Sequence, residues 1–419
     1  MHFSEAAITG PTDLQVNLAT LLILALVAAG VPLLVGILRL RVAEVVLLLG
    51  FGVIVGPQVL SLVTINDTIE TFNELGLGLL FFLAGYELER ESLQGRPGRM
   101  AIGGWVLSLV LALGVAAVLD GADIISDYLG VAICLTSTAL GTLLPVLRDR
   151  GLLTTPFGNA FMGAGAAGEF GPILAIALLL GSRSILRTLV ILVVFSLLVY
   201  MVARLPGRMM TQRVRELMDR GHTTSSQTAV RWTVLLLIGL LTLASFFGLD
   251  AVLGAFIAGV ILRQYAPPSS YNRLMPKVEA IGFGFFIPLF FIVSGANLDV
   301  EAIIANPGRL VLFFVLLLVV RGVPQYFLYS RVLPEKRERW QFALYVATGL
   351  PILVAITGLQ VDAGVMRPEN AAALVGAGAL SVLVFPLLGD WINRAALARL
   401  PEAEPGTEDD EAVGEVDAR

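Results

Sequence analysis

The sequence predicts an all-α polytopic membrane protein with about thirteen transmembrane helices, and three observations lead to this prediction. Hydrophobic residues make up 57% of the 419 residues and charged residues only 15%, whereas a soluble chain carries about 25% charged residues. The mean hydropathy is +0.85. Long apolar runs recur from Leu14 to Trp391, and each approaches the roughly 20 residues that an α-helix needs to cross the hydrocarbon core.

Thirteen segments have a suitable length and composition, although Gly and Pro interrupt several of them. They lie at about 14–38, 43–61, 70–88, 100–118, 124–147, 154–181, 184–203, 231–248, 250–266, 279–297, 308–331, 339–360 and 369–392. The first segment lacks a basic start and a small-residue cleavage site, so we expect a retained helix rather than a signal peptide. The membrane domain is expected to cover 1–400. The tail 401–419 carries eight carboxylates and one arginine and is expected to be disordered and cytoplasmic.

The basic residues predict the orientation of these helices. Of the 28 lysine and arginine residues, 22 fall in loops on one side of the membrane, and only Arg183, Arg187, Arg309 and Arg367 fall in loops on the other side. Cytoplasmic loops carry an excess of basic residues. We therefore expect the N-terminus outside and the C-terminus in the cytoplasm, in a plasma or inner membrane. The alternation of basic and weakly basic loops also supports the count of thirteen helices, because leaving out one helix would place basic loops on both sides of the membrane.

An internal repeat relates the third segment to the tenth. A shift of 210 residues aligns Phe81 with Phe291, Gly85 with Gly295, Leu88 with Leu298, Glu89 with Asp299 and Thr138 with Thr348. Seven helices separate the partners, and because seven is odd, the second copy crosses the membrane in the opposite sense. Such inverted repeats are typical of secondary transporters. We predict repeats at about 14–181 and 231–392 with a basic linker at 204–230; the alternative is chance similarity between two Phe/Gly-rich helices.

Two of the predicted helices carry hydroxyls, glycines and prolines at mid-depth, which predicts that they are discontinuous. These residues are Thr136, Ser137, Thr138, Gly141 and Pro145 in the fifth segment, and Thr348, Gly349 and Pro351 in the twelfth. A helical proline leaves the carbonyl four residues earlier unpaired, so the carbonyls of Gly141 and Ala347 are expected to face a ligand. Unwound backbone at this depth is tolerated only where it lines a cavity or is buried in protein. The alternative is a proline-kinked but continuous helix.

Two ionisable residues lie near the middle of predicted helices, namely Glu169 in the sixth and Arg321 in the eleventh. A charge at the bilayer centre costs at least about 2.5–3.5 kcal/mol, so such residues usually have a function. Pro172 is expected to free the carbonyl of Gly168 beside the Glu169 carboxylate. A carboxylate beside an unpaired carbonyl and hydroxyl oxygens is a suitable site for a small cation.

Competition for one carboxylate is the minimal chemistry of cation/proton exchange, because Glu169 can hold a proton or a metal ion but not both. The predicted ion- and proton-binding residues are therefore Glu169, which would bind Na⁺ or K⁺, with Thr136, Ser137, Thr138 and Gly168. Arg321 does not deprotonate in practice. Its predicted role is a fixed countercharge, either to Glu169 or to the negative C-terminal ends of half-helices. A purely structural pair of Glu169 and Arg321 is the alternative.

The composition excludes several other classes of function. Cys134 is the only cysteine, which excludes a disulfide framework and a thiolate metal site. His2 and His222 are the only histidines, which excludes a histidine metal cluster. No large basic soluble surface is present, so nucleic-acid binding is not expected. We expect no cofactor, and the predicted partners are H⁺, a monovalent cation and the lipid bilayer.

Five motifs in this sequence resemble the monovalent cation:proton antiporter-2 family, the group that contains Kef-type potassium-efflux antiporters and related sodium/proton antiporters. They are Gly52-x-x-x-Gly56-Pro57, ELGLGLLFFLAGYEL (74–88), TSTALGTLLPVLRDRG (136–151), LGAFIAGVIL (253–262) and FFIPLFFIVSGANLD (285–299). The similarity covers about 14–392. It implies a homodimer in which each protomer has a dimerisation domain and a moving core domain with crossing discontinuous helices. It also implies elevator-like alternating access.

The sequence departs from the family pattern beside the carboxylate. The family usually has Asn, Gln or Asp followed by Asp where this chain has Gly168 and Glu169, and many members carry Lys where this chain has Arg321. With a single titrating group, one-for-one electroneutral exchange is expected. The alternatives are a sodium-coupled symporter of small organic solutes with a similar inverted-repeat fold, and a non-transporting membrane sensor. An enzyme is not expected, because the spans contain no catalytic motif and the loops are short.

Overall fold

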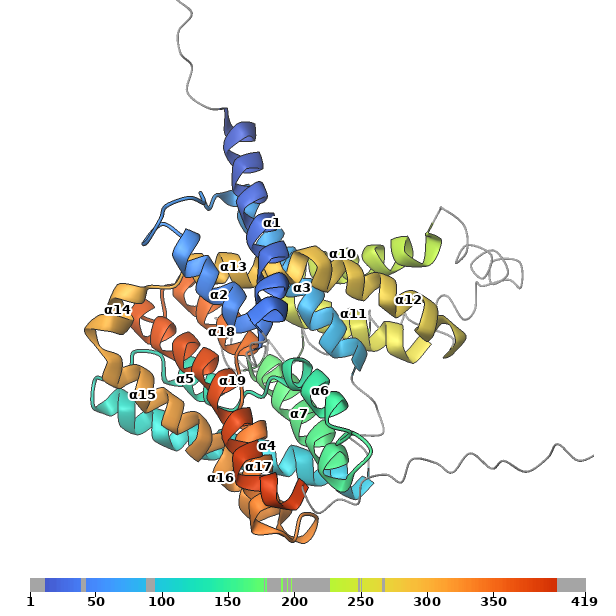
Figure 1. The fold of residues 1–419 in the computed structure, drawn as a ribbon, viewed down its shortest axis with the longest axis vertical. Coiled ribbons are helices and arrows are strands. Elements are labelled where there is room, and N and C mark those ends of the chain that lie inside the picture. Colours follow the sequence, from blue (N-terminus) through green and yellow to red (C-terminus); the bar gives the residue numbers. More distant parts are fainter. Residues whose placement is uncertain are drawn as a thin grey trace, which may run out of the picture.

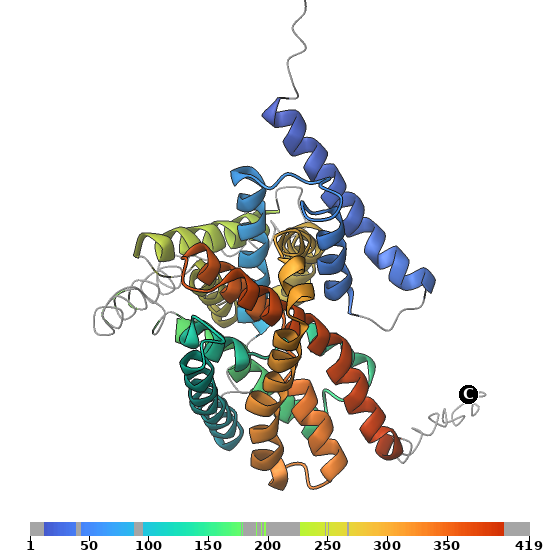
Figure 2. The same ribbon diagram turned by 90° about the vertical axis from the view of Figure 1, so that its left-hand side faces the viewer.

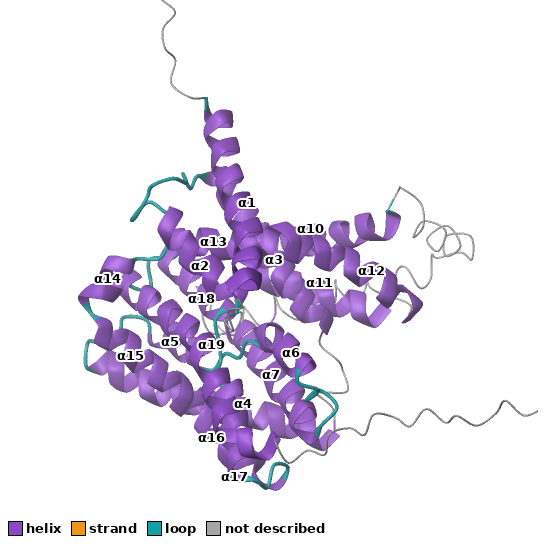
Figure 3. Ribbon diagram, viewed as in Figure 1, coloured by secondary structure: helices purple, strands orange, loops and turns teal. Residues whose placement is uncertain are grey.

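The computed structural model describes residues 12–38, 43–87, 95–176, 227–247, 251–265 and 268–397, together with a few single positions between these ranges. Within these residues the chain is all-helical, with no strand (Figure 3), as the composition predicts. Residues 204–226 of the predicted linker 204–230 lie outside the described residues, as does the whole of the predicted tail 401–419.

The helices form two groups that lie one above the other in Figure 1. The upper group comprises α1 (Asp13–Leu38), α2 (Glu44–Val55), α3 (Asp67–Glu87), α10 (Thr228–Phe247), α11 (Ala251–Tyr265), α12 (Pro268–Ile281), η3 (Gly282–Phe286) and α13 (Ile287–Ala296). The lower group comprises α4 (Gly95–Gly121), α5 (Tyr128–Leu135), α6 (Leu140–Asp149), α7 (Pro156–Ala175), α14 (Val300–Ala305), α15 (Pro307–Leu316), η4 (Leu317–Gly322), α16 (Val323–Leu328), η5 (Tyr329–Arg331), α17 (Lys336–Val346), α18 (Pro351–Asp362) and α19 (Pro368–Leu397). Figure 2 shows the same division from the side, with α1 to α3 (blue) above α4 and α15 to α17 (teal and orange).

Seven helices of the described part of the chain are long and apolar enough to cross a membrane, and three shorter apolar helices accompany them. The long helices cover Asp13–Ile37, Gly95–Gly121, Thr228–Phe247, Leu274–Ala296, Pro307–Arg331, Lys336–Asp362 and Pro368–Asn393, and the shorter ones cover Glu44–Val55, Tyr128–Leu144 and Ala251–Gln264. The chain is therefore a multi-pass membrane protein. The count of thirteen stays a prediction, because most of the expected segment 184–203 lies outside the described residues.

Glycines bring helices of the upper group into backbone contact. A Cβ at Gly85 in α3 would meet the carbonyl oxygen of Phe256 in α11, and a Cβ at Gly295 in α13 would meet that of Leu49 in α2. Small residues at helix interfaces allow such close approach in membrane proteins. The two contacts correspond to each other in the predicted repeat, since Gly85 and Gly295 are the pair that the 210-residue shift aligns.

A second pair of glycines makes the reciprocal contacts of the same helices. A Cβ at Gly52 in α2 would meet the carbonyl oxygen of Ile292 in α13, and a Cβ at Gly259 in α11 would meet that of Phe82 in α3. The pairing of α2 with α13 thus repeats the pairing of α11 with α3, and each pairing has one such glycine on each of its two helices. This packing supports the predicted inverted repeat, whose boundaries remain a prediction.

Candidate functional site

Both helices that the sequence predicts to be discontinuous are interrupted in the lower group. The first break covers 136–139, between α5 and α6, and the second break covers 347–350, between α17 and α18. The two breaks contact each other, because the backbone N–H of Ala139 donates to the carbonyl of Thr348 at 2.7 Å. That these helices cross within the membrane stays a prediction.

The second break lies where the sequence places it. Thr348 and Gly349 are in the break, and Pro351 is the first residue of α18, where its missing N–H needs no helical partner. For the first break the prediction is partly wrong, because Gly141 and Pro145 lie within α6 rather than in the interruption.

Tertiary hydrogen bonds explain why the first break precedes the proline. The backbone N–H of Thr138 donates to the carbonyl of Gly168 at 3.0 Å, and that of Ala139 donates to Thr348. Helix termini leave backbone donors without intrahelical partners. Here α7 and the second break supply those partners, so the position of the break depends on packing and not on the local sequence alone.

Arg321 joins three elements around the two breaks. It lies in the π-helix η4 and is completely buried. Its Nε donates to Thr138 Oγ1 at 3.0 Å, and its Nη2 donates to the carbonyl of Ala164 in α7 at 2.7 Å. Thr138 Oγ1 in turn donates to the carbonyl of Val346 at 2.7 Å. The guanidinium therefore holds the first break against α7 and, through Thr138, against the end of α17.

Gly168 fits this arrangement because it has no side chain. A Cβ at this position would meet both Thr138 Oγ1 and Arg321 Nη2. The prediction that its carbonyl is unpaired is wrong: Pro172 removes the helical partner, but the backbone N–H of Thr138 takes its place. The carbonyl is thus already engaged on one side, and the space that a side chain at Gly168 would need is filled by the arginine and the threonine.

Glu169 lies in the middle of α7 and is 7% exposed. No ion pair joins these two described residues, Glu169 and Arg321, because the hydrogen bonds of the guanidinium go to Thr138 and Ala164. Glu87, the last residue of α3, lies near enough for its negative charge to disfavour a charged Glu169. A buried charge without a partner is strongly unfavourable. The carboxylate is therefore chemically suited to bind a proton or a cation in exchange for one another.

Of the four hydroxyls near the breaks, three already donate to backbone carbonyls. Thr136 Oγ1 donates to Ile133 at 2.8 Å, Thr348 Oγ1 donates to Leu344 at 3.1 Å, and the third is Thr138 Oγ1. The buried Ser137 Oγ has no hydrogen-bond partner. Among these candidates Ser137 is therefore the hydroxyl that keeps its full capacity to bind a ligand.

Two residues near the site are not identified by the sequence analysis. Ser381 in α19 accepts from the backbone N–H of Gly349 at 3.2 Å and donates to the carbonyl of Gly378 at 2.7 Å. It is completely buried, and its only sequence signal is a serine within an apolar helix. Glu87 is the other residue; its position near the end of a predicted helix suggests a place at the membrane interface rather than near Glu169.

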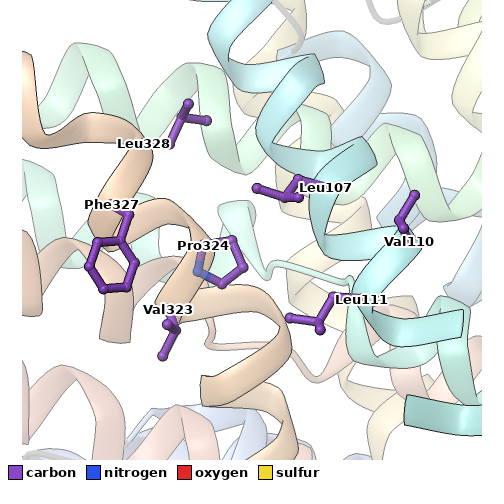
Figure 4. Close-up of a pocket in the computed structure, with 7 residues that line it drawn as sticks. All are labelled: Leu107, Val110, Leu111, Val323, Pro324, Phe327 and Leu328. Carbon is purple, nitrogen blue, oxygen red and sulfur yellow. The ribbon is translucent and has the colours of Figure 1, made fainter. Parts of the chain in front are cut away.

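A groove on the described residues has a lining different from that of this cluster. It has a volume of about 590 Å³ and lies between α4 and α16 (Figure 4). Its lining is apolar and consists of Leu107, Val110, Leu111, Val323, Pro324, Phe327 and Leu328. None of these is a predicted site residue, so the candidate site is the buried cluster and not this groove.

Comparison with known proteins places this architecture in a family. The family model described as "Sodium/hydrogen exchanger, transmembrane" matches residues 22–393. The chain belongs to the sodium/hydrogen exchanger family. The resemblance to monovalent cation:proton antiporters is thereby confirmed.

The curated relatives of this exchanger-family chain include potassium-efflux proteins. The glutathione-regulated potassium-efflux system protein KefC of Escherichia coli O45:K1 and that of Shigella flexneri are both 29% identical to it over 384 residues. The alignment covers 89% of this chain but 60% of each KefC chain. The chain therefore spans less than two thirds of the length of these relatives.

Solved structures share the fold of this family member at low sequence identity. A structure of the sodium proton antiporter MjNhaP1 from Methanocaldococcus jannaschii at pH 8 aligns with a TM-score of 0.58 and 16% identity, covering 92% of this chain and 99% of that chain. An electron-microscopy structure of MjNhaP1 aligns with a TM-score of 0.61 and 18% identity, covering 94% of this chain and 100% of that chain. The similarity supports the fold of the membrane domain.

Proposed function

We propose that the protein is a secondary antiporter that exchanges protons for a monovalent cation, Na⁺ or K⁺. The observation that carries this proposal is the position of Arg321, which bonds Thr138 and Ala164 and leaves the buried Glu169 without an ion-pair partner. Family membership supports it. The named relatives are a potassium-efflux protein and a sodium proton antiporter, so both cations are candidates.

The proposed chemistry is competition at Glu169. The protonated carboxyl and the carboxylate with a bound monovalent cation carry the same net charge, so either form satisfies the buried site. Ser137 Oγ and the open lone pairs of break carbonyls are proposed to complete the oxygen ligands of the cation. Arg321 stays charged throughout and neutralises the negative C-terminal ends of α5 and α17 at the breaks. One carboxylate that carries one H⁺ or one cation gives electroneutral exchange.

Elevator-like alternating access is proposed for the movement of the site. All the candidate residues lie in the lower group of helices, whereas the upper group is closely packed through its glycines. Phe170, next to Glu169, stacks on Phe256 of α11 with ring centroids 5.2 Å apart, so the carboxylate is close to the boundary between the groups. A displacement of the lower group along this boundary would carry Glu169 from one side to the other.

The assembly and orientation follow from the same proposal. We propose a homodimer in a plasma or inner membrane, with the N-terminus outside and the C-terminus in the cytoplasm. The asymmetric distribution of basic residues in the loops supports this orientation.

Dissipation of a pH gradient in proteoliposomes tests the function. Purified protein is reconstituted with an imposed gradient, and Na⁺, K⁺ and Li⁺ are added in parallel while an internal pH dye is recorded. We expect at least one cation to collapse the gradient, and Glu169→Gln protein in matched vesicles to show no response. A flat response of the wild-type protein to all three cations would contradict the antiporter assignment.

A further inference from the structure

A polar cluster, buried except for its arginine, lies in the lower group, apart from Glu169 and Arg321. Its centre is Asp390 of α19, which is 8% exposed. A single oxygen, Asp390 Oδ1, accepts from Tyr345 Oη at 2.6 Å and from Gln341 Nε2 at 3.1 Å, and it also forms an ion pair with Arg150 Nη1. Asn393 Nδ2 donates to Gln341 Oε1 at 2.6 Å. We call these five residues the Asp390 cluster.

The cluster ties together the helices that build the candidate site. Arg150 is the C-cap of α6, which follows the first break, and Tyr345 belongs to α17, which precedes the second break. The ring of Tyr345 also makes edge-to-face contacts with Phe157 and Phe161 of α7, at centroid distances of 5.7 and 6.2 Å. Asp390 therefore connects α6, α17 and α19 directly, and it connects to the helix of Glu169 through the tyrosine ring.

Two short connections lead from the cluster to the breaks. Tyr345 is followed by Val346, whose carbonyl accepts the hydroxyl of Thr138, the partner of Arg321. On the other helix, α19 carries Ser381, which bonds the backbone of Gly349. The same helix thus contacts the second break directly and contacts α17 through Asp390.

We propose that Asp390 is a positioning residue for the cation and proton site: by fixing α6 and α17 it sets the separation of the two breaks and hence the geometry around Glu169. This inference rests on the proposed function of that site. The Asp390 carboxylate is buried and binds three donors from two other elements. We therefore expect its loss to have a larger effect than the loss of an exposed ion pair, which contributes little to stability. Loss of its charge leaves Arg150 without a counter-ion and weakens three bonds at once.

Matched variants distinguish positioning from general stability. Asp390→Asn keeps an oxygen for the donors but removes the charge, and Tyr345→Phe removes one hydroxyl while retaining the ring between Phe157 and Phe161. Asp123→Asn is the control, because it breaks the exposed ion pair between Asp123 and Arg367. We expect Asp390→Asn to raise the apparent KM for the cation about fivefold or more at similar maximum rate, since hydrogen bonds to charged groups are the strong ones. Tyr345→Phe should show a smaller rise, and the control none.

Amide hydrogen exchange tests the same proposal without transport. In detergent-purified protein, Asp390→Asn should speed exchange of peptides that contain 136–139 and 347–350, while peptides from α2 and α13 stay unchanged. Because this readout is independent of antiport, it stands even where the wild-type protein proves not to exchange cations. Unchanged exchange at both breaks, or a KM equal to that of wild type in both Asp390→Asn and Tyr345→Phe, would overturn the positioning role. An equal rise of KM in Asp123→Asn would do the same.

Discussion

Arg321 donates from Nε to Thr138 Oγ1 at 3.0 Å and does not pair with the carboxylate of Glu169. The sequence leaves two roles open for this arginine, as a countercharge to Glu169 or to the ends of half-helices, and the observed bond favours the second. The consequence is chemical. A buried carboxylate without a fixed arginine partner needs a counter-charge that can dissociate. A proton and a monovalent cation are the two species proposed for this role.

Glu169→Gln should abolish cation-driven proton movement in proteoliposomes while the protein still folds. A neutral amide has nearly the same shape as the carboxyl group, but it neither releases a proton nor balances the charge of a cation. Glu169→Asp should remain active with an altered apparent KM, because the carboxylate is withdrawn by one methylene. The measurement is dye-reported pH change on addition of Na⁺ or K⁺, with size-exclusion profiles as the folding control. Wild-type exchange in folded Glu169→Gln protein would mean that another group carries the ion.

Removal of a hydroxyl from the first break should affect either cation affinity or stability, depending on the residue. Ser137→Ala should raise the apparent cation KM with little loss of stability, since Ser137 Oγ has no protein partner to lose. Thr138→Ala should lower stability by about 1–3 kcal/mol, because it leaves the Val346 carbonyl and Arg321 Nε without their partner. Thermal unfolding in detergent and transport assays together resolve the two effects.

Thr136→Ala and Thr348→Ala serve as controls for the hydroxyl series. Both hydroxyls donate to carbonyls of their own helices, so their removal should change cation affinity less than Ser137→Ala does. If Ser137→Ala transports with the wild-type KM while either control raises it, the assignment of Ser137 as an ion ligand is incorrect.

The two central residues of the candidate site, Glu169 and Arg321, can be proposed from the sequence, whereas their partners in the fold cannot. Charges within apolar helices are rare, which is why Glu169 and Arg321 are recognisable from the amino-acid sequence alone. The bond between Thr138 and Arg321 joins positions 183 residues apart and depends on how α7, η4 and α17 pack. Nothing in the local sequence marks Thr138 rather than Glu169 as the partner of the arginine.

The first break and α19 depend on contacts between distant parts of the chain, which local sequence patterns do not show. The sequence predicts an interruption of this helix, but Gly141 and Pro145 lie within α6, and the break is at 136–139 because Gly168 and Thr348 accept backbone bonds there. The contacts of Ser381 and Asp390 with the elements around the breaks are not recognisable in the sequence. Both lie in α19, a long helix of mostly apolar residues, and only the fold shows that both contact elements next to the breaks.

Close glycine contacts in the upper group should be sensitive to a single methyl group. Gly85→Ala and Gly295→Ala should each destabilise the protein by about 1–3 kcal/mol, because the new Cβ would meet the backbone of the neighbouring helix. Gly103→Ala is the control, since nothing lies within 4 Å of a Cβ at that position. The measurement is the unfolding midpoint in detergent. An effect of Gly103→Ala as large as that of Gly85→Ala would show that the loss does not come from the helix contact.

The stoichiometry of exchange follows from the groups around Glu169. Gly168 has no room for a second carboxylate, because a Cβ there would already meet Thr138 Oγ1 and Arg321 Nη2. Arg321 remains charged, so it does not supply a second proton in the way that a titrating lysine would. One group that holds either one H⁺ or one monovalent cation moves no net charge in a cycle. We therefore expect electroneutral antiport, with an apparent cation KM that rises as the pH falls because protons compete for the same carboxylate.

Transport at clamped membrane potential measures this directly. Proteoliposomes are held at a set potential with valinomycin and matched K⁺, and Na⁺ or Li⁺ is used as the substrate. The exchange rate should stay constant as the imposed potential changes, and a solid-supported membrane should record no steady transport current. A rate that climbs steeply with potential would require a second proton carrier. Glu87, whose negative charge disfavours a charged Glu169, is the group to test first, and Glu87→Gln would then have to restore independence from the potential.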